Sequence, residues 1–292
     1  SYVVNPRTED IMGTEIQTLN DELNMDSFIA ALDSGTDSDL MKMSGQDDGE
    51  TPKMGLPRLT INYDTENDDG VTLKRGTWRI WNGSAPVYAE KVHIRPLMRT
   101  FEWSHWDQEE RTFSCKSIQK PKLSGEFPDS LGGNKCGRLS KDEENSMSPD
   151  DPRVLLSKSV NCNQVIYGVL EAPDATYADG TPAPIEDMAF VAYFKRSGFI
   201  PVKNFIDQEL TRNKKVLMQK AVIEMTTEKH KKGSVLYWTP KLSLVREVSI
   251  NDKDKELLRK FNDTVKGHNE TVFADFKAAQ KSMMSADDSD LA

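Results

Sequence analysis

Aromatic and cationic side chains alternate closely between residues 76 and 115, and this stretch constrains the fold more than any other part of the chain. It holds four of the five tryptophans, in short runs where apolar and polar residues alternate as they do in half-buried strands. Asn82 and Gly83 form a strong hairpin signal, and Pro96 is expected to bend a strand or to place it at a sheet edge. The pattern predicts a meander of antiparallel strands.

The remaining segments extend this β pattern and add helices. Further strands are predicted within residues 59–63, 164–170, 189–195, 216–225 and 234–237, and a short helix within 199–210. Residues 119–153 are rich in glycine and proline and are predicted to form a long inserted loop. A C-terminal helical segment is predicted over 251–284, as two helices or one helix kinked at Gly267. The elements together predict a mainly β (α+β) protein.

Charge is distributed unevenly along the 292 residues, whose net charge is -9. Residues 1–70 carry 4 Lys and Arg against 16 Asp and Glu, whereas residues 71–250 carry 27 against 22. Residues 1–55 are therefore predicted to form an acidic, flexible arm, and residues 285–292 an acidic tail. The middle of the chain is mildly basic, which keeps nucleic acid open as a partner because electrostatic steering is local.

Several classes of protein are disfavoured by composition. No apolar run approaches the roughly 18 residues of a membrane span, and mean hydropathy is -0.62. The N-terminus shows no secretory signal pattern, and three cysteines do not make a disulfide framework, so a cytoplasmic protein is expected. Nucleotide-binding loops, nucleophile elbows and zinc-protease motifs are missing from the sequence, and we expect no enzymatic activity.

The aromatic and cationic side chains predict a single-stranded nucleic-acid site, because flat rings stack on unpaired bases and cations follow the phosphate backbone. The alternative is that the rings form the core of a sheet. Neighbouring strand residues point to opposite faces, so either Trp78 or Arg79 faces outward, and the sequence leaves both assignments open. The candidate binding residues are Trp78, Arg79, Trp81, Arg95, Arg99, Trp103 and Lys116.

The three cysteines raise the question of a structural zinc ion. Cys115, Cys136 and Cys162 could bind one with His105 as the fourth ligand, which would attach the long loop to the sheet. The spacing includes no close Cys-x-x-Cys pair, so buried free thiols are the alternative. No other cofactor is indicated.

The stretch from residues 59–63 through 95–103, with the later strand at 162–170, the terminal helix and the acidic tail, resembles the single-stranded DNA-binding proteins encoded by bacteriophages. This resemblance implies an OB-like β-barrel over residues 56–250. It also implies non-catalytic binding of single-stranded DNA during replication or recombination in the host-cell cytoplasm. In such proteins a flexible acidic end can compete with DNA for the binding groove and can recruit replication proteins. The acidic N-terminal arm of this chain departs from the resemblance, because many such proteins begin directly with the folded domain.

Two other functions compete with DNA binding. In a phage structural or assembly protein, the aromatic residues would be core and the arm and terminal helix would make subunit contacts. Alternatively, the protein could be an interaction factor that acts on the host machinery through its acidic arm. The sequence does not specify the oligomeric state.

Overall fold

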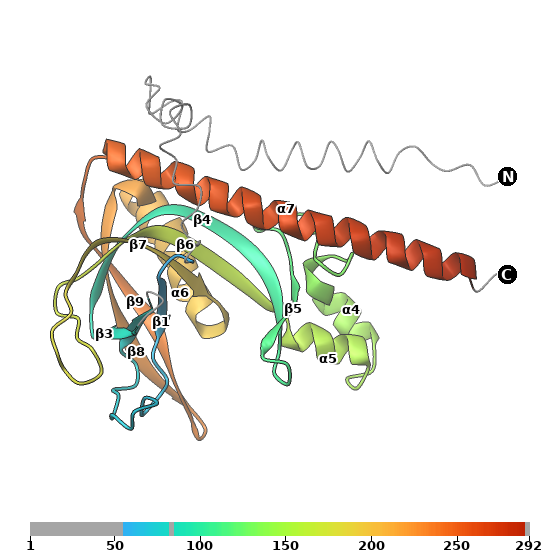
Figure 1. Cartoon of the computed structure of the whole chain (residues 1–292), viewed down its shortest axis with the longest axis horizontal. Helices are drawn as coiled ribbons and strands as arrows, with labels where there is room; N and C mark the ends of the chain where they lie inside the picture. Colours follow the sequence, from blue (N-terminus) through green and yellow to red (C-terminus); the bar gives the residue numbers. More distant parts are fainter. Residues whose placement is uncertain (1–54, 82–84, 290–292) are drawn as a thin grey trace.

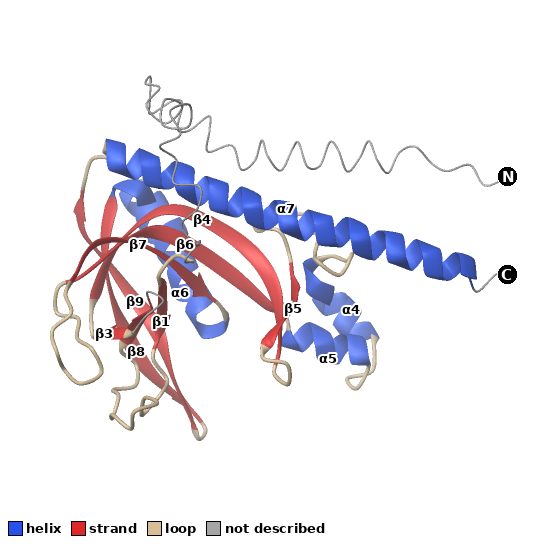
Figure 2. Ribbon diagram, viewed as in Figure 1, coloured by secondary structure: helices blue, strands red, loops and turns tan. Residues whose placement is uncertain are grey.

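The computed structural model describes residues 55–81 and 85–289, with side chains described as far as residue 284. Apart from Gly55, the predicted acidic arm lies outside the described residues, as do the proposed hairpin residues Asn82 and Gly83. The described chain is a mixed α+β structure in which helices lie on both sides of one large sheet (Figures 1 and 2).

The sheet has nine strands: β1 (Arg58–Ile61), β2 (Trp78–Trp81), β3 (Val87–Ala89), β4 (Val92–Asp107), β5 (Thr112–Lys116), β6 (Asn161–Ala172), β7 (Ile185–Phe194), β8 (Ala221–Lys232) and β9 (Val235–Glu247). Their order is β3-β2-β1-β7-β6-β4-β8-β9, with β5 paired to the far end of β4. The β1–β7 pair is parallel and the other pairs are antiparallel, so the sheet is mixed.

Helices cover both faces of this sheet. The 38-residue α7 (Asp252–Ser289) packs Leu258, Phe261 and Val265 against β4, β6 and β7, and we call this side the α7 face. On the opposite side, the α6 face, α6 (Phe199–Asn204) continues into the π-helix η3 (Phe205–Lys214). These two segments bury Val202, Ile206 and Leu210 in the largest core cluster. The central strands are thus buried on both faces.

Strand β4 organises the sheet because it pairs with β5, β6 and β8. Pro96 does not end the strand: β4 runs through this residue and is 16 residues long. A β-bulge lies between Pro96 and Met98, opposite Gly168. A bulge inserts one residue into the alternation, so side chains before and after it exchange faces.

The OB-like barrel predicted from the resemblance is wrong, because the sheet remains open. The edges near β2 and β8–β9 approach each other, but the contacts involve side chains: Trp78 Nε1 donates to the Met225 carbonyl at 2.9 Å, and Tyr63 OH donates to the Trp238 carbonyl at 3.2 Å. No backbone ladder joins these edges in the described residues. The helical segments α6 and η3 fill the interior on this side of the sheet, where they pack in the same core cluster as Trp78.

Two other expectations need correction in detail. The segment 119–153 is not entirely a loop, since it contains the 3₁₀ turn η1 (Lys135–Gly137) and α4 (Lys141–Ser146), and it leads into α5 (Pro152–Ser159). The C-terminal segment is one continuous helix through Gly267 that extends to Ser289, into the predicted acidic tail. Short 3₁₀ turns η2 (Arg196–Gly198) and η4 (Met218–Lys220) complete the structure. Within the described ranges, no helix has the length and apolar character of a membrane span.

Gly168 is required by the close approach of β4 and β6 at the bulge. A Cβ atom there would lie 2.3 Å from the carbonyl oxygen of Arg95, and backbone in the centre of a sheet cannot easily move away. We expect Gly168→Ala to lower the free energy of unfolding by about 1–3 kcal/mol, as overpacking does. Gly267→Ala is the matched control, because nothing lies within 4 Å of its added Cβ. In a helix this change should stabilise by about 0.5–1 kcal/mol. Urea denaturation of both variants measures the two effects, and equal midpoints would contradict the prediction.

Candidate nucleic-acid interface

The predicted binding residues do not form one groove, and Trp78 is the clearest example. Its side chain is fully buried on the α6 face with Ile80, in the main core cluster. Its neighbours along β2, Arg79 and Trp81, point the other way, and Trp81 is 38% exposed. The structure therefore resolves the assignment that the sequence left open: Trp78 is core, and Arg79 and Trp81 face outward.

Arg95 and Arg99 are both neutralised within the fold. Arg95 forms a bidentate ion pair with the carboxylate of Asp254 at the start of α7. Arg99 bonds Asp207 of η3 at 2.8 Å. The bulge at Pro96 explains why two residues four positions apart reach helices on opposite faces of the sheet. Neither guanidinium is thus positioned beside Trp81.

Trp103 and Lys116 lie at the far end of β4 and β5. Trp103 packs edge-on against Phe127, with ring centroids 6.4 Å apart, and contributes to the clusters beneath the 119–140 segment. Lys116 Nζ lies 4.2 Å from the centroid of the Phe113 ring. These residues are far from Trp81, because β1, β7 and β6 lie between β2 and β4, and β5 pairs with β4.

A different group of residues brings cations and rings together on the α7 face, beyond the edge of α7. We call it the outer strip, and it crosses β7, β1, β2 and β3 with Tyr193, Arg58, Trp81, Arg79 and Tyr88. The strand registers place these side chains next to one another: Arg58 is opposite Trp81, and Arg79 is opposite Tyr88. Tyr193 follows Val191, the β7 residue paired with Arg58, by two residues and so lies on the same face.

Within the outer strip, each arginine lies over a ring. The guanidinium carbon of Arg58 is 5.7 Å from the Tyr193 ring centroid, and that of Arg79 is 5.6 Å from the Trp81 ring centroid. Tyr193 and Trp81 keep 37% and 38% of their surface exposed. In the described part of the chain neither arginine has a carboxylate partner, in contrast to Arg95 and Arg99. The strip thus combines accessible rings with cations that are free to bind an anion.

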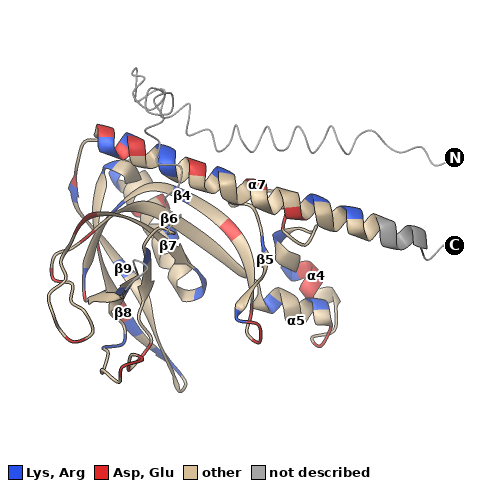
Figure 3. Ribbon diagram, in the orientation of Figure 1, with Lys and Arg blue, Asp and Glu red and all other residues tan. Residues whose placement is uncertain are grey.

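The second aromatic and cationic group, on the β8–β9 hairpin, is mostly packed. Trp238 is 8% exposed, with Arg75 and Lys229 over its ring and Tyr63 against it edge-on. It also blocks Gly76, where an added Cβ would lie 2.2 Å from the indole. The lysines near the hairpin tip are exposed, but basic side chains elsewhere are spread over many elements and do not form one stripe (Figure 3).

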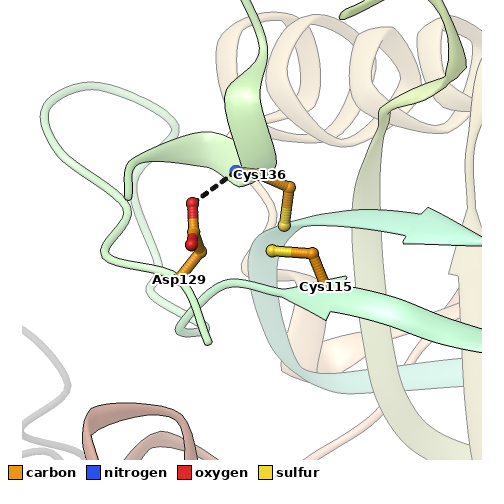
Figure 4. A group of neighbouring side chains, drawn as sticks. All are labelled: Cys115, Asp129 and Cys136. Atoms are coloured by element: carbon orange, nitrogen blue, oxygen red, sulfur yellow. Dashed lines mark hydrogen bonds between the residues drawn. The ribbon is translucent and has the colours of Figure 1, made fainter. Parts of the chain in front are cut away.

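The predicted zinc ligands are only partly brought together. Cys115 and Cys136 lie side by side with Asp129, and their ligand atoms are all within 4.8 Å of one another (Figure 4). Cys162 is not in this group because it pairs with Trp103 on the other side of β4. His105 instead contacts Ser114. Burial is the main cause that raises the pKa of the Cys162 thiol to about 12.

Sequence reasoning found Arg79 and Trp81 but missed Arg58, Tyr88 and Tyr193 as partners. The alternating pattern of residues 189–195 could have placed Tyr193 on the exposed side of a strand. Its position beside Arg58 depends on the parallel β1–β7 pairing, which joins segments more than 130 residues apart and leaves no local signal. Comparison with family models, curated proteins and solved structures gives no match for this chain.

Proposed function

We propose that the protein binds single-stranded DNA through the outer strip, without catalysing a reaction on it. The observation that carries this proposal is the pairing of two arginines with two exposed rings, Arg58 with Tyr193 and Arg79 with Trp81, on one face of neighbouring strands. Rings on a rigid sheet can stack on unpaired bases, and arginines beside them can bind the phosphates between those bases.

The strip is wide enough for a strand of unpaired nucleotides to cross it. Strands lie about 4.8 Å apart, so Tyr193 on β7 and Trp81 on β2 are roughly 10 Å apart across the sheet, and Tyr193 is offset by two residues, or roughly 7 Å, along its strand. Arg58 lies on β1 between them. A strand crossing the sheet could thus place bases on the two rings while its backbone passes Arg58. Lys195, two residues beyond Tyr193 and exposed, adds a cation at the same end of the strip.

We expect Trp81→Ala to weaken binding of oligo(dT) by roughly 5- to 150-fold, since loss of one stacked base contact costs about 1–3 kcal/mol. Trp106→Ala is the matched control. Trp106 lies near the end of β4 against Phe113 of β5, with ring centroids 4.9 Å apart, outside the outer strip, and its replacement should leave binding unchanged. Fluorescence anisotropy of a labelled oligonucleotide measures both affinities.

Salt dependence gives a second readout of the same titrations. Each phosphate contact to a single strand contributes about 0.7 to the slope of log affinity against log salt. The double variant Arg58→Ala/Arg79→Ala should therefore lower the slope by roughly 1.4, while Lys241→Ala on β9 should not change it. Absence of oligo(dT) binding at low salt, or equal losses in Trp81→Ala and Trp106→Ala, would refute the outer strip as the binding site.

A further inference from the structure

Two thiols and a carboxylate meet where the 117–137 segment folds back on β5. Cys115, Asp129 and Cys136 are 2%, 1% and 5% exposed, and Figure 4 shows the two sulfur atoms pointing toward one another beside the carboxylate. They come from three separate places: a strand, the centre of the loop and the η1 turn. The two cysteines pack there in a small hydrophobic cluster with Val160 and Trp103.

The Asp129 carboxylate is a buried acid held by backbone alone. N–H groups of Leu131 and Gly133 donate to Oδ1 at 3.0 and 3.1 Å, and that of Cys136 donates to Oδ2 at 2.8 Å. The described structure gives this carboxylate no Lys, Arg or His ion-pair partner. Buried charges are generally paired or coordinate a metal, and Oδ2 retains a lone pair for a further contact.

The backbone at Cys136 is held in an unusual conformation that aims its sulfur at Cys115. Lys135 and Cys136 have φ values of 53° and 55°, in the left-handed region that costs roughly 1–2 kcal/mol for a residue with a Cβ. Such conformations persist where surrounding contacts over-determine them, and they cluster at functional sites. The turn therefore presents the thiol in a fixed direction.

We propose that Cys115, Cys136 and Asp129 bind a zinc ion. Two thiolates and one carboxylate match the ligand preference of Zn²⁺, and tetrahedral coordination at about 2.3 Å from each sulfur would place the sulfurs about 3.8 Å apart. The ligand atoms already lie within 4.8 Å of one another, so small side-chain movements would bring three ligands to the ion, and a water molecule would be the fourth. Binding displaces the two thiol protons, which pass to the solvent, and the thiolates donate their electron pairs to the metal.

The same site is poorly suited to oxidation. Cys115 and Cys136 are only 2% and 5% exposed, so an external oxidant has little access to either thiol. Redox-active cysteines are usually partly exposed with a lowered pKa. A metal ion is a better match, because it supplies the positive charge that stabilises both thiolates and Asp129.

Zinc would attach the loop to the sheet and, through the loop, support the outer half of α7. Gln280 Nε2 of α7 donates to the Gly132 carbonyl at 2.8 Å, three residues from Asp129. Gly132 also lies close to Ala279 of α7: a Cβ atom added to Gly132 would be 3.1 Å from the Ala279 Cβ. Metal binding should therefore stabilise a segment that contains little regular secondary structure.

The test is the zinc content of the purified full chain, expressed with added zinc and measured by elemental and native mass spectrometry. We expect one zinc per chain in the wild type and in Cys162→Ser, which is the matched control. Cys115→Ser and Cys136→Ser should each lose most of it. Replacement by Co²⁺ should give the thiolate charge-transfer absorption of a sulfur-bound ion, and chelation should lower the thermal midpoint of the wild type by several degrees.

Three results would overturn the proposal. The first is wild-type protein with far less than one zinc per chain and no response to the chelator. The second is full zinc content in both Cys115→Ser and Cys136→Ser. The third is an intact mass two hydrogens below that of the thiol form, with loss of Cys115 and Cys136 alkylation, which would identify a disulfide. The chelation arm uses the unmodified chain, so it remains decisive if a serine variant does not fold.

Discussion

Asp254→Asn is expected to lower the free energy of unfolding by about 3–5 kcal/mol, because it leaves a buried arginine without its counter-charge. The Arg95 and Asp254 side chains are 13% and 1% exposed, and the two terminal guanidinium nitrogens, Nη1 and Nη2, donate hydrogen bonds to the carboxylate. Asp254 also exchanges hydrogen bonds with Asn251, which caps the start of α7. Asparagine retains the shape but only one acceptor, and its NH2 group would face an N–H donor in either orientation, so the variant removes the charge together with a hydrogen bond.

Glu256→Gln on the same helix provides the control. Glu256 pairs with Lys260 at 2.8 Å, but their side chains are 57% and 65% exposed, and such pairs contribute roughly 0–1 kcal/mol. Urea denaturation followed by far-UV circular dichroism compares the two variants. If Asp254→Asn costs no more than Glu256→Gln, Arg95 has access to water and α7 is not held to the sheet by this pair.

The Arg95 pair also shows what the sequence could and could not predict. The alternation of apolar and polar residues located strands such as those within 164–170 and 189–195, because this two-residue period can be read from neighbouring residues alone. The bulge at Pro96 leaves no recognisable mark in the alternation of apolar and polar residues. Because of it, Arg95 faces α7 whereas Arg99 faces η3 on the opposite side of the sheet. Two residues predicted to bind phosphate therefore serve as internal counter-ions.

The barrel error has a related cause. An open sheet and a closed one have the same alternating pattern, and the difference lies in which edges pair and what fills the interior. Here residues 199–214 supply an apolar helical surface that occupies the α6 face. The sequence indicated a short helix over 199–210, but its site of packing depends on contacts with strands far away in the chain.

The two β2 tryptophans give the sharpest test of the face assignment. Trp78→Ala should cost about 3–5 kcal/mol of folding stability, because it removes a fully buried indole from the main core and leaves a cavity. It also removes the hydrogen bond to the Met225 carbonyl. Trp81→Ala, three residues away, should change stability by no more than about 0.5 kcal/mol, as surface substitutions usually do.

For DNA binding we expect the reverse: Trp81 matters and Trp78 does not. Trp81→Ala should remain folded and bind oligo(dT) weakly, whereas Trp78→Phe, which retains most of the buried ring, should bind as the wild type does. Thermal unfolding and anisotropy on these three variants separate the two roles. If Trp81→Ala unfolds as readily as Trp78→Ala, the outer strip is a packed surface, and its rings are unavailable to bases. If Trp78 proves necessary for stability and Trp81 for DNA binding, successive residues of β2 alternate between the core and the binding surface.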